Sequence, residues 1–171
     1  MAEFSKLVIT NGGQALLAKL LSGAEGVEFT KMCTSTTQYT EAQLEGLEKL
    51  TNIKQTSAVS NVVRTNDTAV RVEAAFTNED LGVGYYIYAI GLYAKDPDIG
   101  EILYGVTIET SGKCYMPAYN GVSVTSAYIR LVSTVGNADG VSLEVDSGAY
   151  ATVSDLNELK AKISEKLGID L

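Results

Sequence analysis

The segment from Tyr85 to Gly105 constrains the fold of this chain more than any other stretch. It reads YYIYAIGLYAKDPDIGEILYG, and apolar or aromatic side chains occupy both alternating faces of its first half. Such two-sided alternation is typical of a strand that is central in a sheet or covered on both faces. The following KDPDIG has Pro97 after Asp96 and a closing Gly100, which suits a hairpin turn, and EILYGVTIET predicts a returning strand. The segment therefore predicts a central β-hairpin.

The tyrosines of this hairpin permit more than one interpretation. Aromatic faces can stack on sugar rings while neighbouring polar groups bind the hydroxyls, so a glycan-binding surface is one of them. The chain has no tryptophan, however, and the tyrosines stand among isoleucines and leucines. Because tyrosine also favours strands and can bury its ring, we favour a core or a seam between subunits over a glycan platform.

Strand-like patterns also fill much of the remaining chain. Residues 27–36 alternate, residues 55–64 and 68–76 predict two strands joined by a turn, and residues 114–145 predict two or three more. In 68–76 the apolar side chains alternate cleanly with charged ones, so one face of that strand is expected to be buried and the other wet. The body of the protein is therefore predicted to be rich in antiparallel β-structure.

Two helices are predicted before the hairpin. Residues 14–23 carry a stripe of leucines, with Thr10 or Asn11 as the N-cap and Gly23 just past the end. The two glycines before this helix lack the Gly-Lys-Ser/Thr that a phosphate-binding loop requires. Residues 40–50 predict a short acidic connector helix that begins with a capping box and carries a solvated face.

A further helix is predicted at the C-terminal end of the sequence, in residues 149–171. Its apolar stripe covers about one and a half heptads, whereas a coiled coil stands alone only with three to four, so the stripe needs a partner surface. We expect an α+β fold: a mostly antiparallel, sandwich-like β body over residues 1–148, a short N-terminal helix, and this C-terminal helix, which would either associate with copies of itself as an oligomerisation segment or pack on the body. The stripe consists of Leu156, Leu159, Ile163 and Leu167.

Composition excludes several classes of partner. With 13 basic and 21 acidic residues the formal net charge is −8, so phosphate backbones and anionic lipid would repel the chain as a whole. No apolar run approaches the roughly 20 residues that span a bilayer. We therefore expect no nucleic acid and no membrane among the partners.

The residue types that most enzymes use are poorly represented. The chain has no histidine, which removes Ser-His-Asp triads, Cys-His nucleophiles and histidine-ligated zinc. Cys33 and Cys114 are far apart in sequence, which favours two buried reduced thiols while leaving a disulfide open. Asp96, Asp98 and Glu101 could suggest calcium, but an EF-hand loop needs further acidic positions, so a solvated turn is favoured. We expect no enzyme, no metal and no cofactor.

Two stretches resemble the N-terminal domain of bacteriophage tail fibre proteins of the tail-collar type. The first is LVITNGGQALLAKLLSGAEGVEFTKM, and the second is AAFTNEDLGVGYYIYAIGLYAKDPDIGEILYGVT. That family opens with an LTxxG stretch before a small-residue helix and later carries an EIGLY-A-D…G-ILY hairpin preceded by FTN. The resemblance spans residues 7–107, and Ala89 stands at the usual glutamate of EIGLY. The matching hairpin positions are Ile90, Gly91, Leu92, Tyr93, Asp96, Gly100, Leu103 and Tyr104.

The resemblance implies a virion structural protein of a phage or a phage-derived (prophage) contractile tail. Such a domain attaches a tail fibre to the baseplate, commonly as a homotrimer, with baseplate or tail proteins as partners. The protein would be made in the bacterial cytoplasm and reside in the virion tail. A carbohydrate- or receptor-binding module at the tail tip stays open as the alternative.

Overall fold

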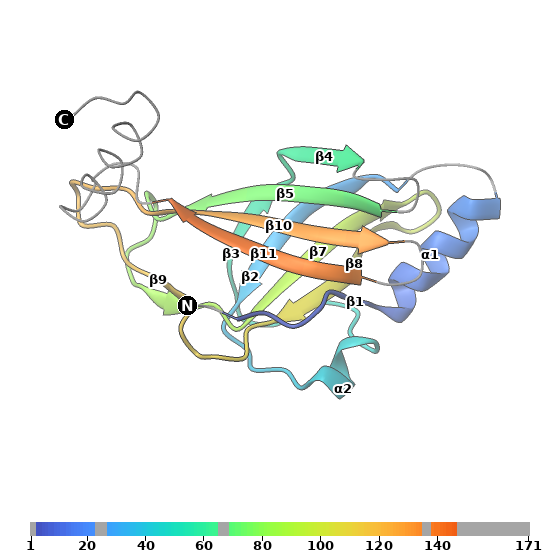
Figure 1. The fold of residues 1–171 in the computed structure, drawn as a ribbon, viewed down its shortest axis with the longest axis horizontal. Coiled ribbons are helices and arrows are strands. Elements are labelled where there is room, and N and C mark those ends of the chain that lie inside the picture. The colour runs from blue at the N-terminus through green and yellow to red at the C-terminus, as the bar shows by residue number, and fades with distance from the viewer. Residues whose placement is uncertain (1–2, 23–26, 65–68, 135–137, 147–171) are drawn as a thin grey trace, which may run out of the picture.

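The computed structural model describes residues 3–22, 27–64, 69–134 and 138–146 (Figure 1). Strands dominate these residues, which confirms a mostly antiparallel β body. The predicted C-terminal helix, with Leu156, Leu159, Ile163 and Leu167, lies outside the described residues. The helices are α1 (Asn11–Ser22) and α2 (Glu41–Leu44). The strands are β1 (Val8–Ile9), β2 (Phe29–Ser35), β3 (Ile53–Ala58), β4 (Asn61–Arg64), β5 (Ala69–Thr77), β6 (Tyr85–Tyr86), β7 (Ala89–Asp96), β8 (Gly100–Ile108), β9 (Tyr115–Met116), β10 (Ser126–Thr134) and β11 (Ala138–Asp146).

The strands form two larger sheets and one small one. A five-stranded sheet has the order β1-β8-β7-β2-β3, a four-stranded sheet has the order β11-β10-β5-β4, and β6 pairs with β9 alone. All pairings are antiparallel. In Figure 1, β5, β10 and β11 cross in front of the strands of the five-stranded sheet.

The predicted hairpin is the centre of the five-stranded sheet. β7 lies between β8 and β2, and every β7 residue except Lys95 is buried, so the expectation of a central strand covered on both faces is confirmed. The expectation of one continuous strand from Tyr85 is wrong. Ile87 donates its backbone N–H to the Cys114 carbonyl, while Tyr88 donates to Ser35. The chain changes strand partners between these residues, from β9 to the five-stranded sheet, and this change separates β6 from β7.

The predicted single strand over residues 55–64 is also divided. The Val59 N–H donates to the Thr30 carbonyl in β2, and the Ser60 N–H donates to the Glu73 carbonyl in β5. The chain therefore passes from one sheet to the other at this dipeptide, so β3 and β4 belong to different sheets. Alternation alone could not reveal this, because the period of two continues across a bend.

Both larger sheets contribute side chains to one hydrophobic cluster. Helix α1 adds Leu16 and Leu20 of the predicted leucine stripe to this cluster. Tyr104 of β8 lies edge-on to Phe29, with ring centroids 5.1 Å apart, and its hydroxyl lies 3.0 Å from Ser133 Oγ on β10. The five-stranded sheet contributes Met32, Ile90, Leu92, Ala94 and Tyr104, and the four-stranded sheet contributes Val72, Ala74, Phe76, Ala127, Ile129 and Leu131.

A second hydrophobic cluster covers the opposite face of the five-stranded sheet. Leu44 and Leu50 from the connector pack there against Tyr93, Leu103 and other sheet residues. The predicted helix over residues 40–50 is shorter than expected, because α2 ends at Leu44 and the chain turns. The leucine spacing of this segment thus reflects burial against the sheet and not a continued helix.

Candidate functional site

The hairpin positions singled out in the sequence form the packed frame of the body. Ile90, Leu92 and Tyr104 face the cluster shared by both sheets, whereas Tyr93 and Leu103 face the second cluster. The sequence therefore identified positions that the fold brings together on β7 and β8. Their burial makes them structural positions, since side chains in such a core are not available to a partner.

Two glycines of the hairpin have different physical roles. A Cβ at Gly91 would lie only 2.7 Å from Leu50 Cδ1 and 2.9 Å from Leu103 Cδ1, so this position lets the connector approach the sheet closely. Gly100 has a φ of +90° and open space around it, so it serves the turn. The expectation that Gly100 closes the hairpin turn is confirmed.

Ala89 occupies a position with no exposed surface. It is 0% exposed, lies in the second hydrophobic cluster, and pairs with Ser35 on β2 and Ile108 on β8. A methyl group fits this apolar setting. A carboxylate there would need a buried partner, because an unpaired charge is costly to bury.

The N-terminus of α1 is built directly onto β8. The Gly13 N–H donates to Thr10 Oγ1 at 3.0 Å, and the Thr10 hydroxyl donates to the Leu103 carbonyl at 2.5 Å. The Thr10 N–H in turn donates to the Tyr104 carbonyl at 3.0 Å. Of the two predicted N-cap candidates, the structure selects Thr10, which joins the helix to the hairpin.

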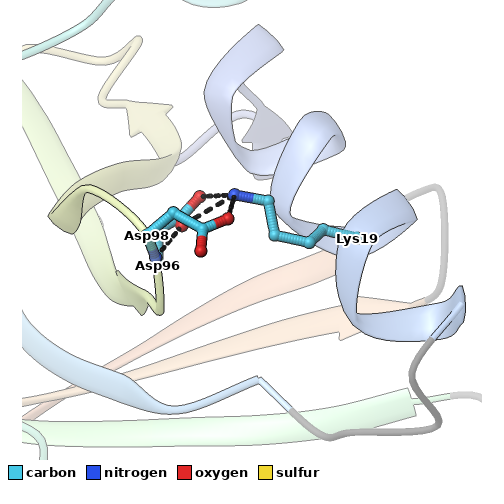
Figure 2. Close-up of polar contacts among 3 residues, drawn as sticks. All are labelled: Lys19, Asp96 and Asp98. Carbon is cyan, nitrogen blue, oxygen red and sulfur yellow. Dashed lines mark hydrogen bonds and ion pairs between the residues drawn. The ribbon is translucent and has the colours of Figure 1, made fainter.

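Lys19 ties the far end of α1 to the hairpin turn (Figure 2). Its Nζ lies 2.8 Å and 3.0 Å from the two carboxylate oxygens of Asp96 and 2.8 Å from Asp98 Oδ2. Asp96 Oδ1 also accepts the Asp98 N–H at 2.8 Å, and the Asp96 side chain is only 5% exposed. The hydrogen bond from Lys19 and then that from the Asp98 backbone lower the pKa of Asp96. The hydrogen bonds to Asp96 and Asp98 raise the pKa of Lys19.

The acidic turn does not gather its carboxylates around one point. Glu101 points instead to the β2 side of the sheet, where its Oε1 lies 2.8 Å from Lys31 Nζ and its Oε2 accepts the Thr30 hydroxyl at 2.6 Å. Within the described residues no group of three or more Cys, Asp or Glu side chains could hold a metal ion. Asp96, Asp98 and Glu101 instead bind lysines and backbone, and so lock the turn.

Replacing Lys19 by methionine should make the free energy of unfolding vary less with pH in the acidic range. A lowered folded-state pKa means that Asp96 contributes stability above its ordinary pKa, about 3.9, and that this contribution is lost as pH falls through the folded value. The stability gap between K19M and the parent should therefore be widest near neutral pH and close below about pH 4. Denaturant unfolding between pH 2.5 and 7 measures it. Lys95→Met, an exposed lysine of the same hairpin, is the matched control, and an equal gap for both variants would contradict the assignment.

The hairpin tyrosines divide into buried and exposed groups. Tyr85, Tyr93 and Tyr104 are at most 8% exposed, which confirms that part of the set belongs to the core. The Tyr85 hydroxyl lies 2.7 Å from Thr34 Oγ1 and donates to Gln55 Oε1 at 2.5 Å, and burial raises its pKa to about 12. Tyr86, in contrast, is 46% exposed.

Both cysteines are free and buried, as the sequence favoured. Burial raises the pKa of Cys33, and burial with the nearby Glu109 charge raises the pKa of Cys114 to about 12. At pH 8 the thiolate fraction of Cys114 should then be about one in ten thousand. We expect the folded protein to react with a chromogenic disulfide reagent at least about a hundredfold more slowly than the unfolded chain, in which both thiols should titrate. Rapid titration of a thiol in the folded state would contradict this placement.

Glu109 is an organising residue that the sequence did not reveal. Its carboxylate accepts the Glu3, Ser111 and Lys113 backbone N–H groups and the Ser111 hydroxyl. Burial opposes its ionisation, but the donors from Ser111 and Glu3 outweigh that effect and lower its pKa overall. Glu109 thus joins the N-terminal strand region to the loop after β8. The sequence pattern does not predict this role of Glu109, because the groups that donate to its carboxylate are mostly backbone N–H groups.

An open groove of about 370 Å³ lies between β3 and β5. Its walls are joined by side chains, since Gln55 Nε2 donates to the Thr77 carbonyl at 2.6 Å and Ser57 Oγ to the Ala75 carbonyl at 2.7 Å. These hydrogen bonds satisfy backbone carbonyls of β5 at positions beyond its pairing with the short β4. The groove is therefore the seam by which the two sheets meet, with Lys54 and Asp80 also in its lining.

Taken together, these side chains join the strands, helix α1 and the hairpin turn of one β body. The chain belongs to the family of phage tail-collar fibre proteins, whose N-terminal model matches residues 1–154. This match confirms the family to which the hairpin and the N-terminal helix pointed, and the family implies a place in the virion tail. No curated protein sequence and no solved structure matches this chain. Among the described residues no helix is long and apolar enough to cross a membrane.

Proposed function

We propose that this chain attaches a tail fibre to the baseplate of a phage or phage-like contractile tail. The observation that carries the proposal is the match of residues 1–154 to the N-terminal part of tail-collar fibre proteins. The absence of histidine and the structural use of the distinctive carboxylates support a non-enzymatic role. Burial of surface between tail proteins, and not a reactive group, would supply the free energy of attachment.

A pull-down from a tail-particle lysate tests attachment. The chain, tagged at one end and immobilised, should retain a baseplate or other tail protein that mass spectrometry identifies. The same chain unfolded before immobilisation, and an unrelated protein of similar acidity, are the controls. Equal recovery of tail proteins on all three surfaces would contradict attachment.

We further propose that the chain forms a homotrimer with two functional parts, the body over residues 1–148 and the segment 149–171. The segment's stripe of Leu156, Leu159, Ile163 and Leu167 is placed to bring copies together at the start of a fibre. Light scattering at micromolar concentration should give about 55 kDa, three times the 18.2 kDa of one chain. A monomeric mass that deletion of residues 152–171 leaves unchanged would contradict the trimer.

A glycan-binding role at the tail tip is the second candidate, because Tyr86, Tyr115 and Tyr119 are exposed and the Tyr86 and Tyr115 rings lie together. The neighbouring Asn120 is less supportive, since its Oδ1 accepts the Val122 and Ser123 N–H groups and so holds its own loop. Saturable binding on a glycan array that Tyr119→Ala abolishes would favour this role. Signal at background level would remove it.

A further inference from the structure

An exposed apolar surface lies where the small sheet β6-β9 meets two loops. It consists of Val83, Tyr86, Tyr115 and Tyr119, which are 79%, 46%, 51% and 38% exposed, and is called the tyrosine patch below. The Tyr86 and Tyr115 rings are in contact, with centroids 4.8 Å apart. A clustered set of large exposed apolar side chains marks an interaction surface more often than scattered ones do.

The fold holds this patch in place. The Tyr119 N–H donates to the Leu81 carbonyl at 2.9 Å, which joins the two loops. Asn78 fixes their bases, because its Nδ2 donates to the Pro117 carbonyl at 3.1 Å and its Oδ1 accepts the Thr125 N–H at 2.9 Å. A side chain at Gly84 would overlap the hydroxyl end of Tyr115, so this glycine lets Tyr115 lie close to the backbone.

The chain leaves the described body close to the patch. Asp146, the last residue of β11, pairs with Ser126, which pairs with Thr77, the neighbour of Asn78. In Figure 1 the C-terminal end of β11 and strand β9 both lie on the left side of the body. Two strand spacings separate Asp146 from Thr77, or about 10 Å, and the patch begins within about 20 Å beyond it.

The following segment can reach the patch and has the matching chemistry. Leu156, the first residue of the leucine stripe, lies ten positions after Asp146, and ten positions span up to about 35 Å. At helical spacing Lys160 and Lys166 flank that stripe. The loop beside the patch carries the exposed acidic pair Glu79 and Asp80. The apolar stripe therefore matches the apolar patch, and the two lysines match the two carboxylates in charge.

We propose that the tyrosine patch is the docking surface for residues 149–171 of the same chain. The apolar stripe packs on the tyrosine rings, and its flanking lysines lie toward Glu79 and Asp80. This docking supplies the partner surface that a stripe of one and a half heptads lacks. It rests on the helical stripe of the proposed function but assigns that stripe another contact: a stripe buried on its own body does not join copies, so a trimer would then form through other surfaces.

Hydrogen exchange on the full chain tests the docking. Leu159→Asp combined with Ile163→Asp removes the stripe, and we expect amide exchange in residues 81–88 and 113–119 to rise at least about fivefold while β10 is unchanged. Glu158→Gln with Glu165→Gln, on the opposite side at helical spacing, is the matched control and should leave exchange unchanged. Unchanged exchange around the patch in the stripe variant would overturn the proposal.

A photo-crosslinking amino acid at Val83 identifies the occupant directly. The expected product links position 83 to a peptide within 149–171 and migrates as one chain of 18.2 kDa, whereas the same group at the exposed Tyr128 should not capture that segment. A product of two chains, or a link to another segment, would overturn docking within the chain. Loss of the trimer mass in the stripe variant, with patch exchange unchanged, would likewise overturn it while leaving trimerisation and baseplate attachment standing.

Discussion

Replacing Tyr104 by alanine should lower the free energy of unfolding by about 4 kcal/mol, the usual range for removing a large buried aromatic side chain being about 3 to 5 kcal/mol. Tyr104 is 1% exposed, lies among core residues of both large sheets, and contacts Phe29 edge-on. Its loss would leave a cavity at the point where the hairpin meets the four-stranded sheet. Denaturant unfolding followed by circular dichroism measures the change.

Two further tyrosine variants separate packing from hydrogen bonding. Tyr104→Phe keeps the ring and removes only the bond to Ser133 Oγ, so it should cost about 1 to 2 kcal/mol. Tyr128→Ala removes a tyrosine that is 41% exposed and should change stability by no more than about 0.5 kcal/mol. If Tyr104→Ala lowered the free energy of unfolding as little as Tyr128→Ala does, the two sheets would not share this core.

The second large effect is expected at the start of α1. A Cβ at Gly13 would overlap the backbone carbonyl oxygen of Tyr104 and would lie 2.9 Å from Ile9 Cγ2. A backbone atom held in a central sheet cannot give way as a side chain can, so Gly13→Ala should destabilise the protein by about 3 kcal/mol. The helix would have to move off the hairpin, which would also strain the Thr10 bonds that join the two elements.

Its neighbour provides the control. A Cβ at Gly12 would meet nothing nearer than 3.8 Å, and alanine is favoured over glycine in a helix by about 1 kcal/mol. Gly12→Ala should therefore be neutral or slightly stabilising in the same unfolding experiment. Similar losses for both variants would show that a general change at the helix start, and not the contact with Tyr104, sets the stability.

Some features of the candidate site followed from the sequence because their causes are local. Two-sided alternation predicted the central hairpin, and the capping chemistry of Thr10 predicted the beginning of α1. The motif positions on β7 and β8 came from the resemblance to the tail-collar family, whose hairpin motif occupies one short stretch of the sequence. The family match to residues 1–154 confirms the family that the hairpin motif suggested.

Other features depend on contacts between residues distant in the chain. The tyrosines of the hairpin have the same chemistry, yet Tyr104 is buried between sheets and Tyr86 is exposed beside Tyr115. Lys19 and Asp96 are 77 positions apart, and no periodicity relates them. Glu109 gained its role from backbone donors that only the folded loop brings near.

The sequence by itself determined the kind of elements, the central hairpin and the family, because propensity, alternation and turn chemistry act over short distances. The tertiary structure alone decided where strands change sheets, which tyrosines are buried and which surface stays open beside the end of β11. Those outcomes are set by pairing between distant segments: a side chain is buried only if another element covers it, and its own neighbours in sequence do not specify that element.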